Sequence, residues 1–156
     1  MKTILLVEDE ALIAMNEARM LANHGYEVLT AYNAQKAIDT VNENDIDLIL
    51  MDIDLGPGKM DGTEAAEIIL KDHNIPVVFL SSHTEPEVVE KTEKITSYGY
   101  IVKNSGDTVL LASLKMAFRL FKANQKIRER EDTLIEEKVR LKEYIGIIEE
   151  RKRIDE

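Results

Sequence analysis

The sequence predicts an α/β fold, a doubly wound five-stranded parallel sheet followed by an extended C-terminal helix. Short apolar runs without polar alternation recur along the first two thirds of the chain, as in strands buried on both faces. Stretches with helical spacing separate these runs, which is the pattern of strand–helix–strand sheets. From Asp107 onward the chain has no proline and a single glycine, Gly146, so we expect a continuous helix there.

Length and composition are those of one compact domain with an appendage. The chain has 156 residues, of which 44% are hydrophobic, enough for a core. Its formal net charge of -10 disfavours binding to nucleic acid phosphates. The absence of cysteine excludes disulfides and thiolate metal sites. No signal peptide and no apolar run of roughly 20 residues is visible, so we expect a cytoplasmic protein that does not enter a membrane.

The strands are expected at five places along the chain: 3–7, 27–31, 46–51, 76–80 and 100–102. The third is the most distinctive, because its unbroken apolar run, Leu48 to Met51, ends abruptly in Asp52. An acid at the C-terminal end of such a strand lies where open α/β sheets bind their ligands.

The helices between these strands have recognisable beginnings and ends. They are expected over 11–23, 33–43, 61–69 and 88–95. Asn33, Asp61 and Thr84 are the predicted N-caps, and Gly25 is predicted to end the first helix. The inner stripe of the first helix is expected at Leu12, Met15, Ala18 and Ala22. Crossovers of this length require right-handed parallel connections, which predicts the flavodoxin-like strand order 2-1-3-4-5.

The C-terminal helix changes character along its length. Its first part has a wide apolar stripe that is expected to pack on the sheet: Leu110, Leu111, Leu114, Ala117, Phe118 and Phe121. Beyond it, apolar residues recur once in seven, at Leu120, Ile127, Leu134, Leu141 and Ile148. The companion positions are mostly polar, so a homodimeric coiled coil and a solvated single helix both remain open. We therefore divide the chain into a domain, 1–122, and a charged helical extension, 123–156.

Polar residues follow four of the five strands directly: Glu8 and Asp9, Asp52 and Asp54, Ser81, and Lys103. In the order 2-1-3-4-5 these four strands are neighbours, and the carboxyl ends of parallel strands share one edge. The side chains are therefore expected to converge on one cleft.

The chemistry of that cleft follows from its charges. Carboxylates gathered in one place repel one another, which raises their pKa values unless a cation joins them. Oxygen ligands without histidine or cysteine suit Mg²⁺, with Mn²⁺ as a substitute. A hydroxyl and a lysine beside them complete a phosphoryl-transfer site with a carboxylate nucleophile. Asp52 is the predicted nucleophile because its strand is the central one.

These residues resemble, in order and spacing, the site of response regulator receiver domains (CheY-like) of two-component phosphorelay signalling, over about residues 2–122. The resemblance implies that Asp52 accepts phosphate from a histidine kinase or a phosphotransfer protein. It further implies that Mg²⁺ is held by Asp9, the Asp52 carboxylate and the backbone carbonyl of Asp54, with Glu8 acting mainly through water.

The same resemblance implies a switch. Ser81 would hydrogen-bond a phosphoryl oxygen, Lys103 would pair with it, and Tyr100 would turn inward as Ser81 moves. Such a protein changes its surface for a partner or an output domain. It is not an enzyme beyond its own phosphorylation and dephosphorylation. The chain either acts alone or is the N-terminal module of a longer signalling protein, and the charged helix after 122 favours the second, as a connector.

Three features depart from the common family pattern. Asn104 follows Lys103 where the family usually has proline, often with a cis bond. A cis bond before a residue other than proline costs about 3–4 kcal/mol, so we expect a trans bond and a rearranged loop. The loop 55–60 is expected to be about two residues longer than usual, by comparison with the family pattern. Asp54 and His83 flank the expected phosphoryl group, and we expect them to tune its hydrolysis.

Two enzyme interpretations compete with this one. Asp52 and Asp54 after a buried strand also resemble the motif of haloacid-dehalogenase-type Mg²⁺-dependent phosphatases. With Glu8, they resemble the metal site of topoisomerase-primase (Toprim) domains. Neither interpretation explains Ser81 and Lys103 together, and the negative charge of the chain argues against a nucleic acid substrate.

Overall fold

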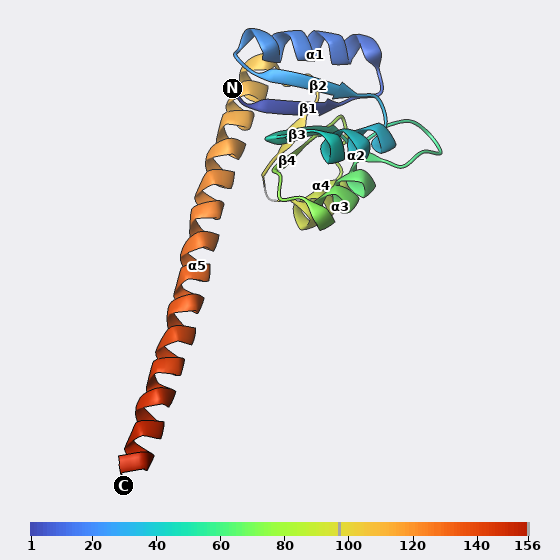
Figure 1. Cartoon of the computed structure of the whole chain (residues 1–156). Helices are drawn as coiled ribbons and strands as arrows, with labels where there is room; N and C mark the ends of the chain where they lie inside the picture. Colours follow the sequence, from blue (N-terminus) through green and yellow to red (C-terminus); the bar gives the residue numbers. More distant parts are fainter. Residues whose placement is uncertain (97, 156) are drawn as a thin grey trace. The chain divides into compact units, whose positions relative to one another are not determined.

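The computed structural model describes residues 1–96 and 98–155 and contains a five-stranded parallel sheet in the order β2-β1-β3-β4-β5, which confirms the predicted fold (Figure 1). The strands are β1 Thr3–Val7, β2 Glu27–Ala31, β3 Leu48–Asp52, β4 Val77–Ser81 and β5 Tyr100–Val102. β3 begins two residues later than expected from the sequence and includes Asp52 itself. The acid is therefore part of the sheet and is held by its hydrogen bonds.

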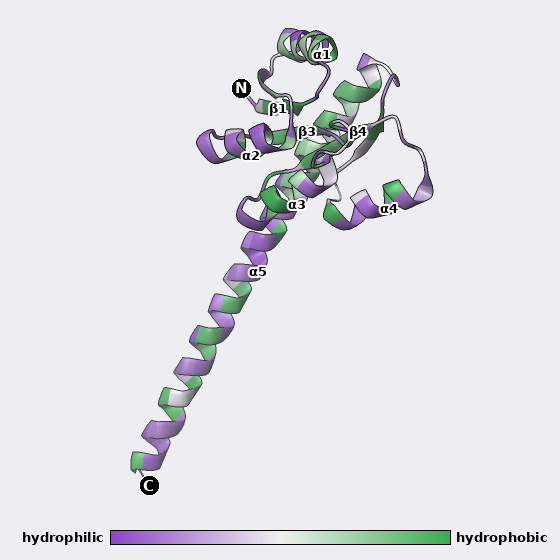
Figure 2. Ribbon diagram, turned by 90° about the vertical axis from the view of Figure 1, so that its right-hand side faces the viewer, coloured by the Kyte–Doolittle hydropathy of each residue, from purple (hydrophilic) through white to green (hydrophobic). Residues whose placement is uncertain are grey.

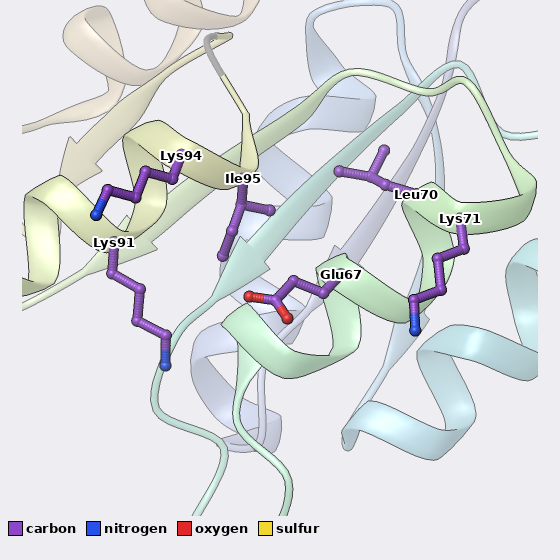
Figure 3. A pocket seen from close by; sticks show the side chains of 6 residues that line it. All are labelled: Glu67, Leu70, Lys71, Lys91, Lys94 and Ile95. Carbon is purple, nitrogen blue, oxygen red and sulfur yellow. The ribbon is translucent and has the colours of Figure 1, made fainter.

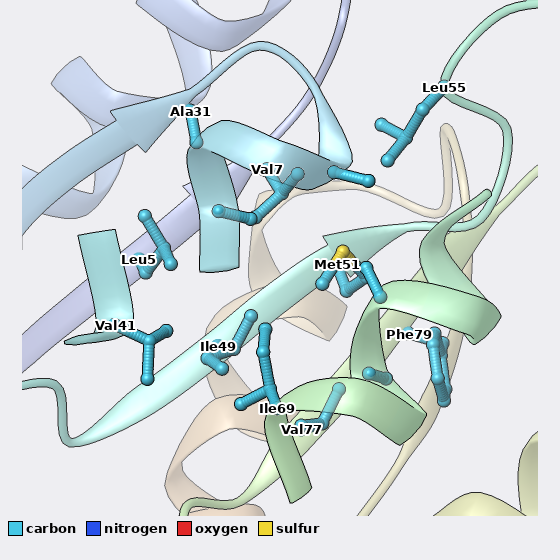
Figure 4. Packing of buried hydrophobic residues seen from close by; sticks show 14 of the residues in the cluster. Leu5, Val7, Ala31, Val41, Ile49, Met51, Leu55, Ile69, Val77 and Phe79 are labelled. Atoms are coloured by element: carbon cyan, nitrogen blue, oxygen red, sulfur yellow. The ribbon is translucent and has the colours of Figure 1, made fainter. Parts of the chain in front are cut away.

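The sheet is covered on both faces, and this explains its uninterrupted apolar runs. Leu5 and Met51 belong to the core on the side of α2 and α3, which Figure 4 shows, whereas Leu6 and Leu50 belong to the core on the side of α1 and α5. Successive side chains of a strand point to opposite faces, so a strand with helices on both sides is apolar throughout.

The helices are α1 Ala11–Asn23, α2 Ala34–Glu43, α3 Gly62–Asp72, α4 Pro86–Ile95 and α5 Asp107–Asp155. Two predicted caps are confirmed: the side chains of Asn33 and Asp61 accept hydrogen bonds from the backbone three residues on. The predicted cap at Thr84 is wrong, because the N-cap of α4 is Glu85, without a side-chain hydrogen bond. Pro86 has a fixed φ and no N–H, so it begins the helix itself and moves the cap to its neighbour.

The predicted inner stripe of α1 is wrong at Leu12, Met15 and Ala22, which are exposed, and only Ala18 of that stripe packs against the core. Leu12 and Met15 are 71% and 55% exposed, whereas Ala14 and Leu21 are fully buried. α1 carries apolar residues on more than one side, so its spacing did not identify the stripe with Ala14 and Leu21 as the buried one. The stripe that packs on the sheet contains Ala14, whose small side chain permits a close approach of the helix. Leu12 and Met15 therefore face solvent.

The chain forms two compact units, Met1–Arg119 and Leu120–Glu156. The first contains the sheet and the first turns of α5, where Leu110, Leu114 and Ala117 are buried. Up to Asp155, the second unit consists of α5 alone. Its once-in-seven apolar residues are all exposed, and Figure 2 shows apolar and polar residues alternating along it. Among the described helices, none is both long enough and apolar enough to span a membrane.

Candidate functional site

Asp52 is the centre of the site, because it ends the central strand and is only 2% exposed. Its Oδ1 accepts a hydrogen bond from the backbone N–H of Asp54 at 3.2 Å. Its Oδ2 accepts one from Nζ of Lys103 at 2.9 Å. The backbone N–H of Lys103 in turn donates to the carbonyl of Ser81. This hydrogen bond continues the β4–β5 pairing and fixes the backbone position from which the Lys103 side chain extends. The backbone of the sheet therefore positions both residues of this ion pair, Asp52 and Lys103.

Three acids gather at this point, as the sequence predicted for Glu8, Asp9 and Asp52. One carboxylate oxygen from each lies within 4.8 Å of the others. Glu8 is fully buried and Asp9 is exposed. Oε2 of Glu8 lies 3.2 Å from Nζ of Lys103, an ion-pair distance, but forms no hydrogen bond with the described residues.

Burial and mutual repulsion make it unfavourable for every carboxyl group of this cluster to be ionised. Burial, together with the neighbouring Asp52 carboxylate, raises the pKa of Glu8 from 4.5 to about 8. Burial would lower the pKa of the Lys103 ammonium, but the carboxylates of Asp52 and Glu8 outweigh it and raise that pKa above its usual value. One lysine therefore offsets only part of the negative charge, and the oxygens left over suit a divalent cation.

Ser81 and Tyr100 lie on the neighbouring strands and both contact the segment after β4. Oγ of Ser81 accepts a hydrogen bond from the backbone N–H of His83 at 3.0 Å, and the Tyr100 hydroxyl donates to the carbonyl of the same residue. The His83 ring lies 3.3 Å from a carboxylate oxygen of Glu85 and 3.9 Å from one of Asp54. His83 thus contacts both predicted switch residues and the acid that follows the β3 strand.

The two loops singled out from the sequence have unusual backbone conformations. The described backbone contains no cis peptide bond, so the Lys103–Asn104 bond is trans, as predicted. Asn104 has a φ of 66°, the left-handed region that asparagine tolerates better than most residues. Gly56 has a φ of 110°, and a Cβ there would lie 4.0 Å from Oδ2 of Asp9. The loop 55–60 therefore passes close to the acidic cluster, while its extra length stays a prediction.

Two residues near the site were not predicted from the sequence. A Cβ on Gly62 would lie 2.0 Å from the carbonyl oxygen of Asp52, and the Gly62 N–H donates to the carbonyl of Ile53 at 2.8 Å. Glu17 on α1 has a buried carboxylate oxygen without a hydrogen bond to the described residues, and burial raises its pKa. The sequence did contain a signal for each of them. Gly62 directly follows the capping Asp61, and Glu17 lies on the same stripe of α1 as Ala14 and Leu21.

The family model of the response regulator receiver domain matches residues 4–115. Among curated relatives, the transcriptional regulatory protein PdtaR of Mycobacterium tuberculosis is 30% identical over 122 residues, which are 78% of this chain. The chain spans 58% of the length of that relative.

Two solved structures are also similar to this chain. The N-terminal domain of a three-domain response regulator/sensory box/GGDEF protein from Carboxydothermus hydrogenoformans is 45% identical, with a TM-score of 0.72, and covers 79% of this chain and 98% of its own. The chemotaxis protein CheY4 of Vibrio cholerae is 25% identical, with a TM-score of 0.70, and covers 75% of this chain and 98% of its own.

Proposed function

The chain belongs to the response regulator receiver domain family, and from this premise we propose that Asp52 is its phosphoacceptor. Receiver domains take up phosphate on an aspartate in two-component signalling, and this membership sets aside the phosphatase and Toprim interpretations. The observation that carries the proposal is the buried Asp52 carboxylate at the end of β3, 2.9 Å from the Lys103 ammonium and inside the acidic cluster.

Mg²⁺ is the cation that fits this cluster, because its donors are all oxygens and their charge exceeds that of the single lysine. Asp9, the Asp52 carboxylate and the backbone carbonyl of Asp54 would hold it, with Glu8 acting mainly through water, and Mn²⁺ would substitute. The ion supplies positive charge that offsets the charge of the donor phosphoryl group.

The transfer step uses the residues of this chain. A carboxylate oxygen of Asp52 attacks the phosphorus of a phosphohistidine, the O–P bond forms, and the P–N bond breaks with its electron pair going to the histidine. The Lys103 ammonium pairs with the phosphoryl oxygens, and the Ser81 hydroxyl donates to one of them. As Ser81 moves, Tyr100 leaves the His83 carbonyl and turns inward. Self-phosphorylation and self-dephosphorylation are the only reactions in this proposal.

Incubation with a small acyl phosphate tests the metal requirement. In the presence of Mg²⁺, intact mass spectrometry is expected to show one added phosphate per chain, because the cation reduces repulsion between Asp52 and the phosphate. With a chelator in place of Mg²⁺, the labelled fraction should fall to the background. Equal labelling in both samples would remove the metal from the proposal.

The natural donor is a histidine kinase or a phosphotransfer protein. The exposed Leu12 and Met15 support a protein donor, because α1 begins two residues after Asp9 and apolar side chains at a surface suit a protein partner. Cytoplasmic localisation stays a prediction, made because the sequence shows no signal peptide and no apolar run long enough to span a membrane. No nucleic acid partner is proposed.

We expect Asp54 and His83 to control how long the phosphate stays on Asp52. Their side chains face each other at 3.9 Å, 40% and 70% exposed for His83 and Asp54, in the loops that flank the site. Asp54→Asn and His83→Ala are each expected to change the rate of dephosphorylation by severalfold, measured by the decay of the labelled mass. Asp45→Asn, an exposed acid in another loop, is the control. Unchanged decay in both variants would end this hypothesis.

The division into a receiver domain, 1–122, and a connecting helix, 123–156, also stays a proposal. The exposed apolar residues at seven-residue spacing support a coiled-coil homodimer through this helix. The name of the Carboxydothermus protein places such a domain at the N-terminus of a three-domain chain, which supports a connector to a further domain.

Light scattering tests the homodimer. We expect a dimer mass for the wild type and a monomer for the Leu134→Glu/Leu141→Glu variant, because two charges in the shared seam would be buried without partners. Val139→Glu places the same charge at an exposed apolar residue outside the seven-residue spacing and should leave the dimer intact. A monomeric wild type, with and without a phosphoryl mimic, would refute the dimer.

A further inference from the structure

A second charged surface lies between α3 and α4, outside the phosphorylation site. It is a groove of about 400 Å³, shown in Figure 3 and lined by Glu67, Leu70, Lys71, Lys91, Lys94 and Ile95. We call it the α3–α4 groove. Its residues come from the middle and end of the two helices, whereas the acidic cluster adjoins the first turn of α3 at Gly62. The groove is therefore a separate place in the fold.

The charge of the groove is opposite to that of the chain. The protein has 30 acids and 20 lysines and arginines, yet the groove is lined by three lysines and one glutamate. None of the three lysines forms an ion pair with any residue that the structure describes, and all three are exposed. Their ammonium groups are therefore available to a ligand of opposite charge.

The helix dipole accounts for only part of this arrangement. Lys71 and Lys94 lie in the last turns of α3 and α4, where a positive charge interacts favourably with the free carbonyls. Lys91 lies about one turn earlier in α4, on the same face as Lys94, and lines the groove as well. The helix dipole does not account for a lysine at that position. Leu70 and Ile95 are partly buried against the core and add apolar surface between the lysines.

We propose that the α3–α4 groove binds an acidic, partly apolar peptide segment of a protein partner, held by Lys71, Lys91 and Lys94 over Leu70 and Ile95. Carboxylates spread along a chain match three flexible ammonium groups on two helices, and an apolar side chain covers the surface between them. Compact phosphate ligands are usually bound at helix N-termini, which this groove lacks. The apolar surface of Leu70 and Ile95 between the lysines suits an apolar side chain of a peptide and offers a polyphosphate no contact. The peptide is therefore favoured over a polyphosphate.

The test measures fluorescence anisotropy of a labelled peptide of Glu-Glu-Leu repeats, titrated with the full chain at about 0.15 M ionic strength. The Lys71→Gln/Lys91→Gln/Lys94→Gln variant should bind about tenfold more weakly, because three exposed ion pairs are removed. The control, Lys36→Gln/Lys115→Gln/Lys122→Gln, removes the same charge from other exposed positions and should change the affinity less than about twofold. Labelling of Asp52 by an acyl phosphate in all three proteins shows that the fold and the first site are intact.

Several results would overturn the proposal. One is that the wild type does not bind the Glu-Glu-Leu peptide, and another is that the groove variant and its control lose the same affinity for it. A third is that the wild type binds a Gln-Gln-Leu peptide as tightly as the Glu-Glu-Leu peptide. Tighter binding of inorganic polyphosphate, lost in the groove variant alone, would assign the groove to a different ligand. If the triple variant fails to fold, Lys91→Gln alone replaces it and should weaken binding by about twofold to threefold. An unchanged affinity in that variant would also overturn the proposal.

Discussion

The Asp52→Asn variant is expected to take up no phosphate from a small acyl phosphate in the presence of Mg²⁺, whereas the wild type takes up one. The amide of asparagine has no negative oxygen to attack phosphorus. It has nearly the same shape as the carboxylate, and its oxygen still accepts a hydrogen bond from Lys103, which lies 2.9 Å from Asp52 in the wild type. Intact mass spectrometry measures the result directly.

The control for this prediction is Asp45→Asn, which removes one acid from an exposed position in another loop. It should be labelled as the wild type is. Circular dichroism of the Asp52→Asn variant should match that of the wild type, so that a missing label reflects chemistry and not unfolding. Labelling that persists in Asp52→Asn would remove this residue from the central role.

Gly62→Ala is expected to destabilise the receiver domain by about 2–3 kcal/mol, the upper part of the range for forcing extra atoms into a packed site. The new Cβ would lie 2.0 Å from the carbonyl oxygen of Asp52 and 2.9 Å from the side chain of Met51. Backbone must move to relieve such a contact, and the nearest backbone carries the phosphoacceptor. Urea unfolding measures the loss of stability, and the rate of phosphate uptake should fall with it.

The matched control is Gly146→Ala, in a part of α5 where a Cβ would meet no atom within 4 Å. Alanine is favoured over glycine in a helix interior by about 1 kcal/mol, so this variant should become more helical rather than less stable. The same substitution thus has opposite expected signs at the two positions. A Gly62→Ala variant as stable as the wild type would show that α3 moves away from Asp52 without cost.

The sheet and the residues at its carboxyl edge can be predicted from the amino-acid pattern. A strand covered on both faces must be apolar throughout, so β1, β3 and β4 are visible as uninterrupted runs, and their separation by helices leaves parallel pairing as the consistent arrangement. Because parallel strands end at one edge, the chain positions of Asp9, Asp52 and Lys103 were sufficient to predict that their side chains meet.

Features that depend on which surfaces pack together become visible in the folded chain and not in the local pattern. Spacing alone pointed to the stripe of Leu12 on α1, whereas the buried stripe is that of Ala14, because burial depends on which side of the helix packs on the sheet. Gly62 contacts Asp52, ten residues earlier, across the loop between β3 and α3, and the buried carboxyl of Glu17 lies near Lys103, far away in the chain. The lysines of the α3–α4 groove are ordinary helix-end residues until two helices are packed side by side. Local patterns record which residues avoid water, but the partner that each of them meets is set by long-range packing.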